Sequence, residues 1–310
     1  MSERSVIVSL TGGLGNQLFQ FAQALASNPN RIWILSSLGR PRSTNGKPDL
    51  LHFALPWNCV PVKKGDAPQF IQKVAGFMLR KGIQRRGLEN FFIINVLLDS
   101  IANLILILYL KRRFTLSIGK GVGYSRIKNS KRQLLIGYFQ HGRHLNNSEF
   151  FDQLRRLVPL EIPNDLSLLI AKAKLEKPIF VHYRLTDYLK EDTFGVPSAN
   201  YYTSALRKLN ARDRKIWVFS DDLEMAEDIL PEEFASNAFF ISEQSFNSAQ
   251  WLQLFRYGKD FVIANSSFSW WGAALRFDCS GIVFAPTPWF KELPEPIDLI
   301  PNDWVRLGAE

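Results

Sequence analysis

Cysteine and histidine are scarce in this chain of 310 residues, which contains two cysteines and four histidines. Cys59 and Cys279 are too few for a disulfide framework or a four-cysteine zinc site, so we expect a reducing compartment. A secretory signal is not expected, because the first residues, MSERSVIVSL, lack a basic stretch followed by a long apolar run. The sequence therefore argues against a secreted, disulfide-stapled protein and against a dedicated zinc site.

Two common metal and nucleotide motifs are also missing. The chain contains no Asp-x-Asp triplet, and the adjacent pair Asp221 and Asp222 is poorly spaced to chelate a metal ion. The glycine-rich segment TGGLGN, which ends at Asn16, is not a G-x-G-x-x-G fingerprint because Leu18 takes the last position, and it is not a P-loop. It nevertheless brings backbone N–H groups and the Asn16 amide to a helix start, where a polar or anionic ligand is plausible.

Positive charge is concentrated in the middle of the chain. The net charge is +9, but residues 61–145 carry +13 and residues 146–310 carry −7. Such a field attracts nucleic acid, acidic lipid or a phosphorylated substrate. We expect no nucleic-acid partner, because no binding module is visible and the basic residues do not alternate with exposed aromatic residues. Peripheral contact of the basic 61–145 region with a membrane surface remains open.

The long apolar run Phe91–Leu110 has the length of a membrane span. Asn95, Asp99 and Asn103 interrupt it, and a carboxylate near its centre would cost about 2.5–3.5 kcal/mol on insertion scales. We therefore predict a buried or interfacial helix pair, within a basic helical insertion at about 67–130.

Alternating strands and helices predict an α/β fold. Residues 5–10 and 31–36 are predicted strands on either side of a helix at 17–27, and residues 38–66 are predicted loop. From residue 133 the strands are almost continuously apolar, which is typical of a parallel sheet covered on both faces. The predicted strands there are 133–140, 179–183, 216–220, 238–241, 261–264 and 282–285, and the predicted helices are 147–157, 200–211, 222–230, 248–258 and 267–277.

Polar side chains follow several of these strands, at the edge where open α/β sheets bind ligands. Arg184 can hold two oxygens of a diphosphate, or it can form a local ion pair with Asp187. His182 can hydrogen-bond a base or a hydroxyl, or it can be a satisfied core histidine. Asp221 or Asp222 can cap the next helix, or hold a nucleobase, a ribose or Arg184.

A second polar group begins the helix predicted at 267–277. Asn265, Ser266 and Ser267 can cap this helix, whose free N-terminus is equally an anion site. Trp270 and Trp271 are predicted to pack the helix against the sheet rather than to stack on a ligand.

Six segments, taken in order, resemble the α-1,2-fucosyltransferases of glycosyltransferase family 11. They are GGLGNQLFQFA near the N-terminus, GYFQ at 137–140, VHYRLTDY, VFSDDLE, ANSSFSWWGAAL, and FAPTPWF at 284–290. The match runs from residue 5 to about residue 304, although residues 40–130 carry no motif.

The resemblance implies an α/β, GT-B-like fold with two Rossmann-like domains facing a cleft. Residues 1–150 are then the N-terminal acceptor-side domain with the basic insertion, and residues 151–310 are the C-terminal domain that binds the GDP-sugar. The implied reaction is a direct displacement with inversion, which moves L-fucose from GDP-β-L-fucose to the 2-hydroxyl of a galactoside. It implies no cofactor and no metal.

The resemblance also assigns site residues. Arg184 is expected at the β-phosphate as a catalytic residue, and Asp187 is the candidate general base, although an Asp with a pKa near 4 is a weak base without local tuning. Leu185 stands where the family motif has a second arginine, and Arg143 is the candidate substitute. The expected donor-binding residues are Gly13, Gly15, Asn16, His182, Arg184, Asp222, Asn265, Ser266, Ser267 and Ser269.

The expected partners are GDP-fucose and a galactose-containing glycan, in a surface polysaccharide or a lipid-linked oligosaccharide. We expect a cytoplasmic protein that is peripheral to the inner face of the plasma membrane. Two alternatives stay open: the same fold with a different GDP-sugar donor, and an inactive relative that binds a glycan.

Overall fold

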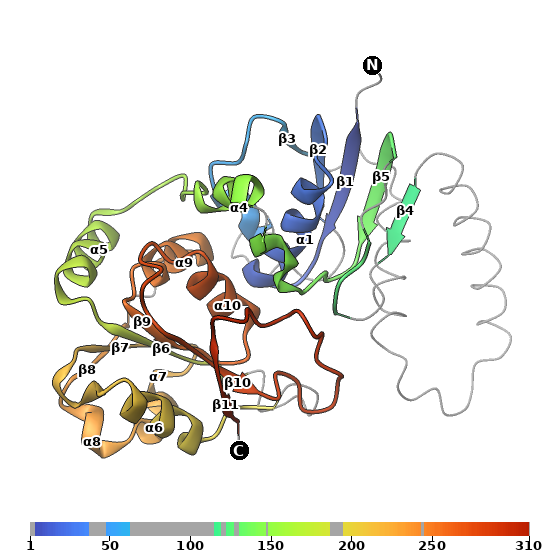
Figure 1. Ribbon diagram of the computed structural model, residues 1–310. Coiled ribbons are helices and arrows are strands. Elements are labelled where there is room, and N and C mark those ends of the chain that lie inside the picture. Colours follow the sequence, from blue (N-terminus) through green and yellow to red (C-terminus); the bar gives the residue numbers. More distant parts are fainter. Residues whose placement is uncertain are drawn as a thin grey trace, which may run out of the picture. The chain divides into compact units, whose positions relative to one another are not determined.

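The chain divides into two compact units, Met1–Leu154 and Arg155–Glu310. The computed structural model (Figure 1) describes residues 4–36, 48–62, 115–118, 122–126, 130–146, 148–186, 195–242 and 245–309. The boundary predicted from the sequence, between residues 150 and 151, lies four residues before the division at 154 and 155.

The first unit is built on a parallel sheet with the strand order β3-β2-β1-β5-β4. β1 lies in the middle, and its side chains at Val6, Val8 and Leu10 are buried, as expected of a strand with neighbours on both sides. The elements are β1 (Ser5–Leu10), α1 (Leu14–Ala26), β2 (Arg31–Ser36), η1 (Asp49–His52), β3 (Cys59–Pro61), β4 (Thr115–Ile118), β5 (Arg132–Ile136), η2 (Gly142–Asn146) and α4 (Ser148–Arg155).

The second unit has a parallel sheet with the order β11-β10-β9-β6-β7-β8. Counted within the unit, this is the 3-2-1-4-5-6 order of a doubly wound dinucleotide-binding fold, viewed from the other side. The elements are α5 (Asn164–Glu176), β6 (Ile179–Tyr183), α6 (Ala199–Lys208), η4 (Ala211–Asp213), β7 (Ile216–Ser220), α7 (Leu223–Ile229), α8 (Glu232–Ala235), β8 (Ala238–Phe240), α9 (Ser248–Phe255), β9 (Asp260–Val262), α10 (Ser267–Ala274), β10 (Val283–Thr287) and β11 (Val305–Gly308).

The two parallel sheets confirm the predicted fold class of two Rossmann-like α/β domains, as in a GT-B-like chain. In Figure 1, α9 and α10 lie on one face of the second sheet, and α6, α7 and α8 lie on the other. Helices therefore cover both faces of this sheet, which explains the almost continuous apolar strands.

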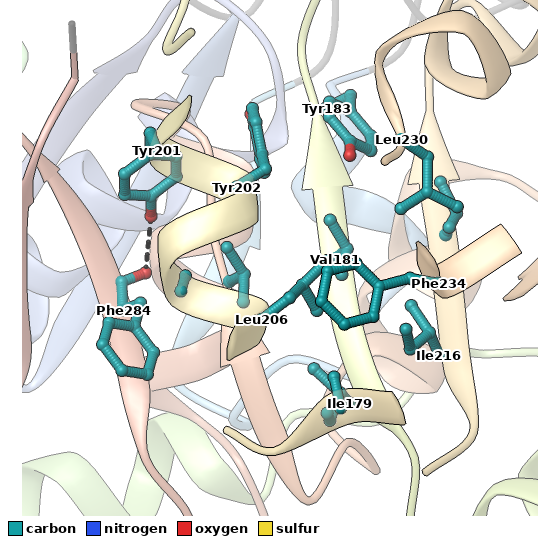
Figure 2. Packing of buried hydrophobic residues seen from close by; sticks show 14 of the residues in the cluster. Ile179, Val181, Tyr183, Tyr201, Tyr202, Leu206, Ile216, Leu230, Phe234 and Phe284 are labelled. Carbon is teal, nitrogen blue, oxygen red and sulfur yellow. Dashed lines mark hydrogen bonds between the residues drawn. The ribbon is translucent and has the colours of Figure 1, made fainter. Parts of the chain in front are cut away.

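The alternating side chains of β6 divide between the two faces of the second sheet. Ile179, Val181 and Tyr183 belong to a buried cluster with the α6 residues Tyr202 and Leu206, as Figure 2 shows. The side chains between them, such as that of Phe180, point to the opposite face, where its ring contacts the ring of Phe255 in α9. Because the strand period is two, His182 and Arg184 point toward that second face.

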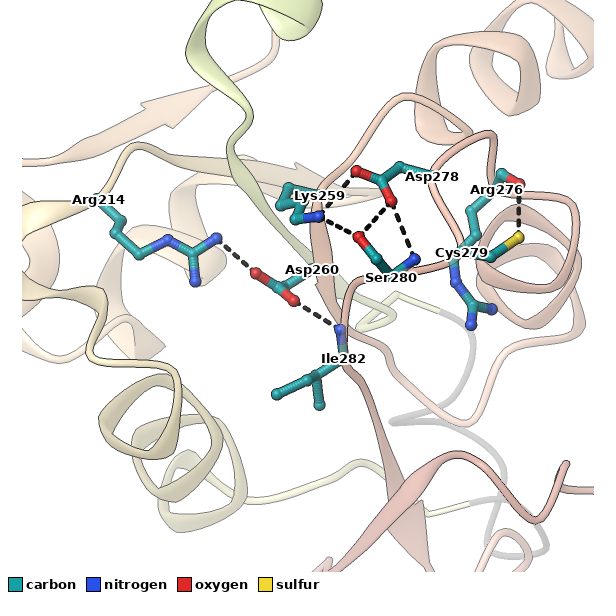
Figure 3. A network of polar contacts seen from close by, with 8 residues as sticks. All are labelled: Arg214, Lys259, Asp260, Arg276, Asp278, Cys279, Ser280 and Ile282. Carbon is teal, nitrogen blue, oxygen red and sulfur yellow. Dashed lines mark hydrogen bonds and ion pairs between the residues drawn. The ribbon is translucent and has the colours of Figure 1, made fainter.

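Ion pairs lie at the amino ends of strands β7, β9 and β10 of the second sheet (Figure 3). The Asp260 carboxylate accepts a hydrogen bond from the Ile282 N–H at 2.6 Å and pairs with Arg214 at 2.5 Å. Lys259 pairs with Asp278 at 2.8 Å. Asp260 begins β9, while Arg214 and Ile282 precede β7 and β10, so one carboxylate connects three strands at this edge.

Several element predictions for the first unit need correction. The helix predicted at 17–27 begins three residues earlier, at Leu14, because the chain turns at Gly12 with a φ of +75°. The strand predicted at 133–140 ends at Ile136, and Phe139 beyond it adopts a left-handed φ of +54°. Residues 38–66 were predicted as loop but include η1 and β3, and Thr115–Ile118, within the predicted insertion, is a strand of the sheet.

In the second unit the predicted strands and helices are present, with ends that differ by a few residues. The sequence pattern missed α5, the short helix α8 and β11. α5 exposes Leu168 and Leu175, so its apolar residues do not follow one helical stripe. β11 is an edge strand with mostly exposed side chains, so it lacks the apolar run that indicates a buried strand.

Within the described part of the chain, no helix is both long enough and apolar enough to cross a membrane. The run Phe91–Leu110, and the helices expected at 67–113, lie outside the described residues.

Candidate functional site

The second sheet has a topological switch point between β6 and β9. These strands are neighbours, but β6 continues to β7 on one side, whereas β9 continues to β10 on the other. Ligands of open α/β sheets bind outside the carboxyl ends of the strands at this point. Arg184 follows β6 directly, and Asn265, Ser266 and Ser267 follow β9, so parallel pairing brings the two predicted groups to one place.

Arg184 is held by a carboxylate from the next strand. Its guanidinium lies 3.2 Å from Asp221, and the two side chains are 26% and 18% exposed. Burial raises the pKa of Asp221, but hydrogen bonds from Thr186 and the Leu185 N–H, together with the Arg184 charge, outweigh it and lower the pKa overall. The pair is therefore ionised at neutral pH. Asp187, the other predicted partner and the candidate base, lies outside the described residues.

His182 is almost completely buried, with 7% of its surface exposed. Its ring contacts Phe255 and Phe268, and its Nδ1 atom has no hydrogen-bond partner among the described residues. Burial, followed by the nearby Arg184 charge, lowers the pKa of His182 to about 3. The imidazole is neutral at physiological pH, so it can hydrogen-bond a ligand but cannot attract one by charge. It is a core histidine, but one with a buried ring nitrogen left unsatisfied.

The residues after β9 form the N-terminus of α10. Ser266 is the N-cap, and its hydroxyl accepts a hydrogen bond from the Phe268 N–H at 3.3 Å. Ser267 is the first helical residue. The helix therefore presents N–H groups and a partial positive charge at the switch point, which suits an anion.

Two of the predicted residues build this turn from the inside. Asn265 is buried, and its amide donates hydrogen bonds to the carbonyls of Gly195 and Trp289, each at 3.1 Å. Ser269 is completely buried, and its hydroxyl lies 3.1 Å from the Ser266 carbonyl. Both side chains shape the loop, which leaves Ser266 and Ser267 as the candidates for direct contact. Trp270 and Trp271 are fully buried, which confirms their predicted packing role.

Asp222 is a helix cap. It begins α7, and its carboxylate accepts a hydrogen bond from the Met225 N–H at 3.1 Å. Its role in donor binding stays a prediction. Asp221 was named as an alternative but not included among the predicted site residues, although the adjacent carboxylates at a strand end were the signal that could have identified it.

Leu185 points away from the switch point. It is 1% exposed and belongs to the buried cluster that contains Tyr183 and Tyr202. Arg143, the candidate substitute for the missing arginine, lies in η2 of the first unit, where its guanidinium is 4.0 Å from the centre of the Tyr124 ring.

The glycine turn of the first unit follows β1, the central strand. Gly12 has a φ of +75°, and a Cβ there would lie 2.5 Å from the side-chain nitrogen of Asn16. Gly13 is the N-cap of α1 with ordinary extended backbone, and a Cβ there would meet no atom within 4 Å. Gly15 and Asn16, predicted in the turn, lie in the first turn of α1. Gly13 is thus a place where the backbone is approachable.

Three buried glutamines lie on α1, two of them hold this turn, and the sequence analysis missed all three. Gln17 donates to the Gly12 carbonyl and accepts from the Leu50 N–H, both at 2.9 Å. Gln20 accepts from the Thr11 N–H at 2.9 Å and donates to the Gly137 carbonyl at 3.0 Å. The third, Gln23, donates to the carbonyl of Ser125. Glutamines three residues apart on an otherwise apolar helix were the available signal.

One further amide contact joins two of the sequence motifs within the first unit. The side-chain amide of Gln140, from GYFQ, donates to the side-chain Oδ1 atom of Asn16 at 2.7 Å. The two motifs are more than a hundred residues apart in the chain, but β1 and β5 are neighbours in the sheet. No group of three or more metal-ligating side chains occurs among the residues that the structure describes.

Comparison with known proteins places the chain in a family. The family model "Glycosyl transferase family 11" matches residues 96–295, and the chain belongs to this family. The resemblance that the six segments indicated is therefore confirmed.

Two relatives from Escherichia coli cover nearly the whole chain. An alpha-1,2-colitosyltransferase is 29% identical over 97% of this chain and 98% of its own length. The O-antigen biosynthesis glycosyltransferase WbnK is 26% identical over 96% of this chain and 99% of its own. Among solved structures, the fucosyltransferase NodZ from Bradyrhizobium is 14% identical, covers 89% of this chain and 94% of that one, and gives a TM-score of 0.47.

Proposed function

We propose that this family 11 glycosyltransferase transfers L-fucose from GDP-β-L-fucose to the 2-hydroxyl of a galactoside, with inversion and without a metal ion. The observation that carries this proposal is that Arg184 and the N-terminus of α10 follow the carboxyl ends of two neighbouring parallel strands, β6 and β9, at the switch point. A diphosphate carries two or more negative charges, and these two groups can bind it without a divalent cation.

The chemistry of the transfer explains why these groups are needed. The acceptor hydroxyl attacks the anomeric carbon of fucose, while the bond from that carbon to the phosphate oxygen breaks and its electron pair stays on GDP. The configuration inverts from β to α, and the hydroxyl proton passes to a base. Arg184 and the N–H group of Ser267, at the first position of α10, would stabilise the charge that develops on the leaving diphosphate.

His182 and the glycine turn receive roles that match their geometry, and Asp187 receives the role that the family motif implies. The neutral His182 ring is proposed to hydrogen-bond the guanosine, because it has an unsatisfied nitrogen but no charge. Asp187 remains the proposed base. The glycine turn is proposed as a substrate contact through Gly13, Gly15 and Asn16.

Calorimetric titration with GDP-fucose, GDP and GDP-mannose, each with and without EDTA, tests the donor and the metal independence together. Arg184→Ala should lose at least tenfold in affinity for GDP. Arg207→Ala is the matched control, because it removes an exposed arginine that pairs with Glu233 in the same unit. EDTA-sensitive binding would refute the metal-independent mechanism, and the absence of any GDP binding by wild type would refute the proposed donor.

A different donor sugar is the second candidate, and the colitosyltransferase relative favours it. Colitose is fucose without its 3-hydroxyl, so one hydrogen bond separates the two donors. A site that hydrogen-bonds this hydroxyl rejects the deoxy sugar strongly, whereas an apolar pocket discriminates weakly. Competition between GDP-fucose and GDP-colitose in a transfer assay distinguishes the candidates. GDP binding without transfer of either sugar to any acceptor would instead favour an inactive, glycan-binding relative.

The acceptor is proposed to be a galactose-containing surface polysaccharide or lipid-linked oligosaccharide, and the name of the second relative, an O-antigen biosynthesis enzyme, supports this. We propose a cytoplasmic enzyme that meets the inner face of the plasma membrane through the basic 61–145 region. Co-sedimentation with anionic vesicles at low salt should occur and should be lost when Arg85, Arg86, Arg112 and Arg113 are changed to Glu. Failure of wild type to bind at low salt would refute the membrane contact.

A further inference from the structure

One carboxylate fastens the whole turn that follows β6. Asp221 begins the loop after β7, the neighbouring strand, and it accepts from three consecutive residues of that turn. Its Oδ1 accepts from the Leu185 N–H at 2.8 Å, and its Oδ2 lies 2.5 Å from the Thr186 hydroxyl and 3.2 Å from the Arg184 guanidinium. The Thr186 N–H adds a fourth contact at 3.3 Å. Both carboxylate oxygens are therefore engaged.

This arrangement restrains an otherwise mobile side chain. A free arginine side chain carries about 2 kcal/mol of rotamer entropy, which a ligand must overcome each time it binds. A fixed ion pair on an anchored turn reduces that loss, because the guanidinium is already oriented before the ligand arrives. Prior orientation of the Arg184 guanidinium matters more here because Leu185, its neighbour, is buried in the core. Arg184 is therefore the one cation among the described residues of this turn, 184–186.

We propose that Asp221 is a positioning residue, which acts through Arg184 to hold its guanidinium ready for the diphosphate of the donor. This inference rests on the proposed function, since it assumes that Arg184 binds a diphosphate. Asp221 itself does not touch the ligand, and its acidic charge would repel one.

Because of this repulsion, the direction in which the affinity for GDP changes in Asp221→Asn distinguishes a positioning role from a simple charge effect. Replacing Asp221 with Asn removes a negative charge near the anion, which by itself would strengthen binding. The same change weakens the contact with Arg184 and the turn, which would weaken binding. A positioning role therefore predicts that Asp221→Asn lowers the affinity for GDP, even though the local charge becomes more positive.

The test is a double-mutant cycle in which GDP is titrated into wild type, Asp221→Asn, Arg184→Ala and the double variant. Asp221→Asn should lose about tenfold in affinity, or about 1.4 kcal/mol. In the Arg184→Ala background the same change should cost nothing further, because Asp221 acts through the arginine. Glu233→Gln is the matched control: it also removes a carboxylate that pairs with arginines, Arg207 and Arg212, and should bind GDP like wild type.

A milder variant keeps the test valid if Asp221→Asn folds poorly. Thr186→Val removes one hydrogen bond to the carboxylate and should weaken GDP binding about threefold, whereas Thr186→Ser should restore it. Unchanged or tighter binding by Asp221→Asn would overturn the proposal, and so would an equal loss in the presence and absence of Arg184. Failure of wild type to bind GDP would be a different result, because it refutes the proposed donor on which this inference rests.

Discussion

Two adjacent glycines in the first unit should respond very differently to the same substitution. Gly12 has a φ of +75°, where alanine costs about 1–2 kcal/mol. The new Cβ would also lie 2.5 Å from the Asn16 side-chain nitrogen. Asn16 would have to move and give up its hydrogen bond from Gln140, which contributes about 0.5–1.5 kcal/mol. Gly12→Ala should therefore lower the free energy of unfolding by about 2–3 kcal/mol.

Gly13→Ala should leave the free energy of unfolding nearly unchanged. Gly13 has a φ of −74° and a ψ of 176°, which alanine adopts readily, and no atom lies within 4 Å of the added carbon. Fewer conformations in the unfolded chain stabilise the variant by about 0.4–1 kcal/mol. Alanine is a poorer N-cap than glycine by about the same amount, so the two effects nearly cancel.

Urea unfolding followed by circular dichroism measures both variants, and a transfer assay shows what the turn does. If the turn contacts a substrate, Gly13→Ala should lose activity at unchanged stability, because its methyl group occupies the open space above the backbone. Equal destabilisation by the two substitutions would refute the conformational reasoning. Full activity of Gly13→Ala would refute the substrate contact.

Three further predictions concern the second unit. Arg256→Met should lower the free energy of unfolding by about 3–5 kcal/mol in urea titrations, because it leaves three buried carbonyls, those of Arg155, Leu157 and Leu275, without their donor. The pKa of His182 is about 3 in the folded state and near 6.5 in the unfolded state, so the contribution of the neutral ring to stability is complete above pH 6.5 and is lost as the pH falls. Between pH 6.5 and 4.5 the free energy of unfolding of wild type should therefore fall more steeply than that of His182→Gln, and the difference in slope should correspond to the uptake of about one proton on unfolding. Asp222→Ser should keep the stability that Asp222→Ala loses, about 1 kcal/mol, and weaker GDP binding by the serine variant would show that Asp222 contacts the donor.

The sequence predicted the fold where the strand signal was strong. β6, β7 and β10 are buried, apolar and bounded by turn residues, so their pattern indicates a strand in any context. β11 was not predicted, because the side chains of this edge strand are mostly exposed and it lacks the apolar run that indicates a buried strand. β5 ends at Ile136, before the left-handed Phe139, although the apolar pattern of the sequence continues beyond that point.

The sequence predicted where the candidate site lies, but not which strands and side chains are neighbours there. Strand-helix alternation predicts that Arg184 and Ser266 each follow a strand. The order of the motifs that contain them indicates one family. The order of the strands decides that β6 and β9 are neighbours, and no local pattern gives that order. For the same reason the partnership of Arg184 with Asp221, which lies on a different strand, remained one alternative among several until the pairing of β6 with β7 was known.

The charge at the switch point depends on which face each residue of the β6 turn takes. Arg184 lies on the face of α10, whereas Leu185 points to the opposite face and packs with Tyr183 and Tyr202. A guanidinium at position 185 would enter an apolar cluster, where an unpaired charge costs several kcal/mol. A second positive group at the switch point comes from the backbone instead: the N-terminus of α10 carries about half an elementary charge. The backbone fixes that charge, and the ion pair with Asp221 at 3.2 Å restrains Arg184, so both positive groups are oriented before a ligand arrives.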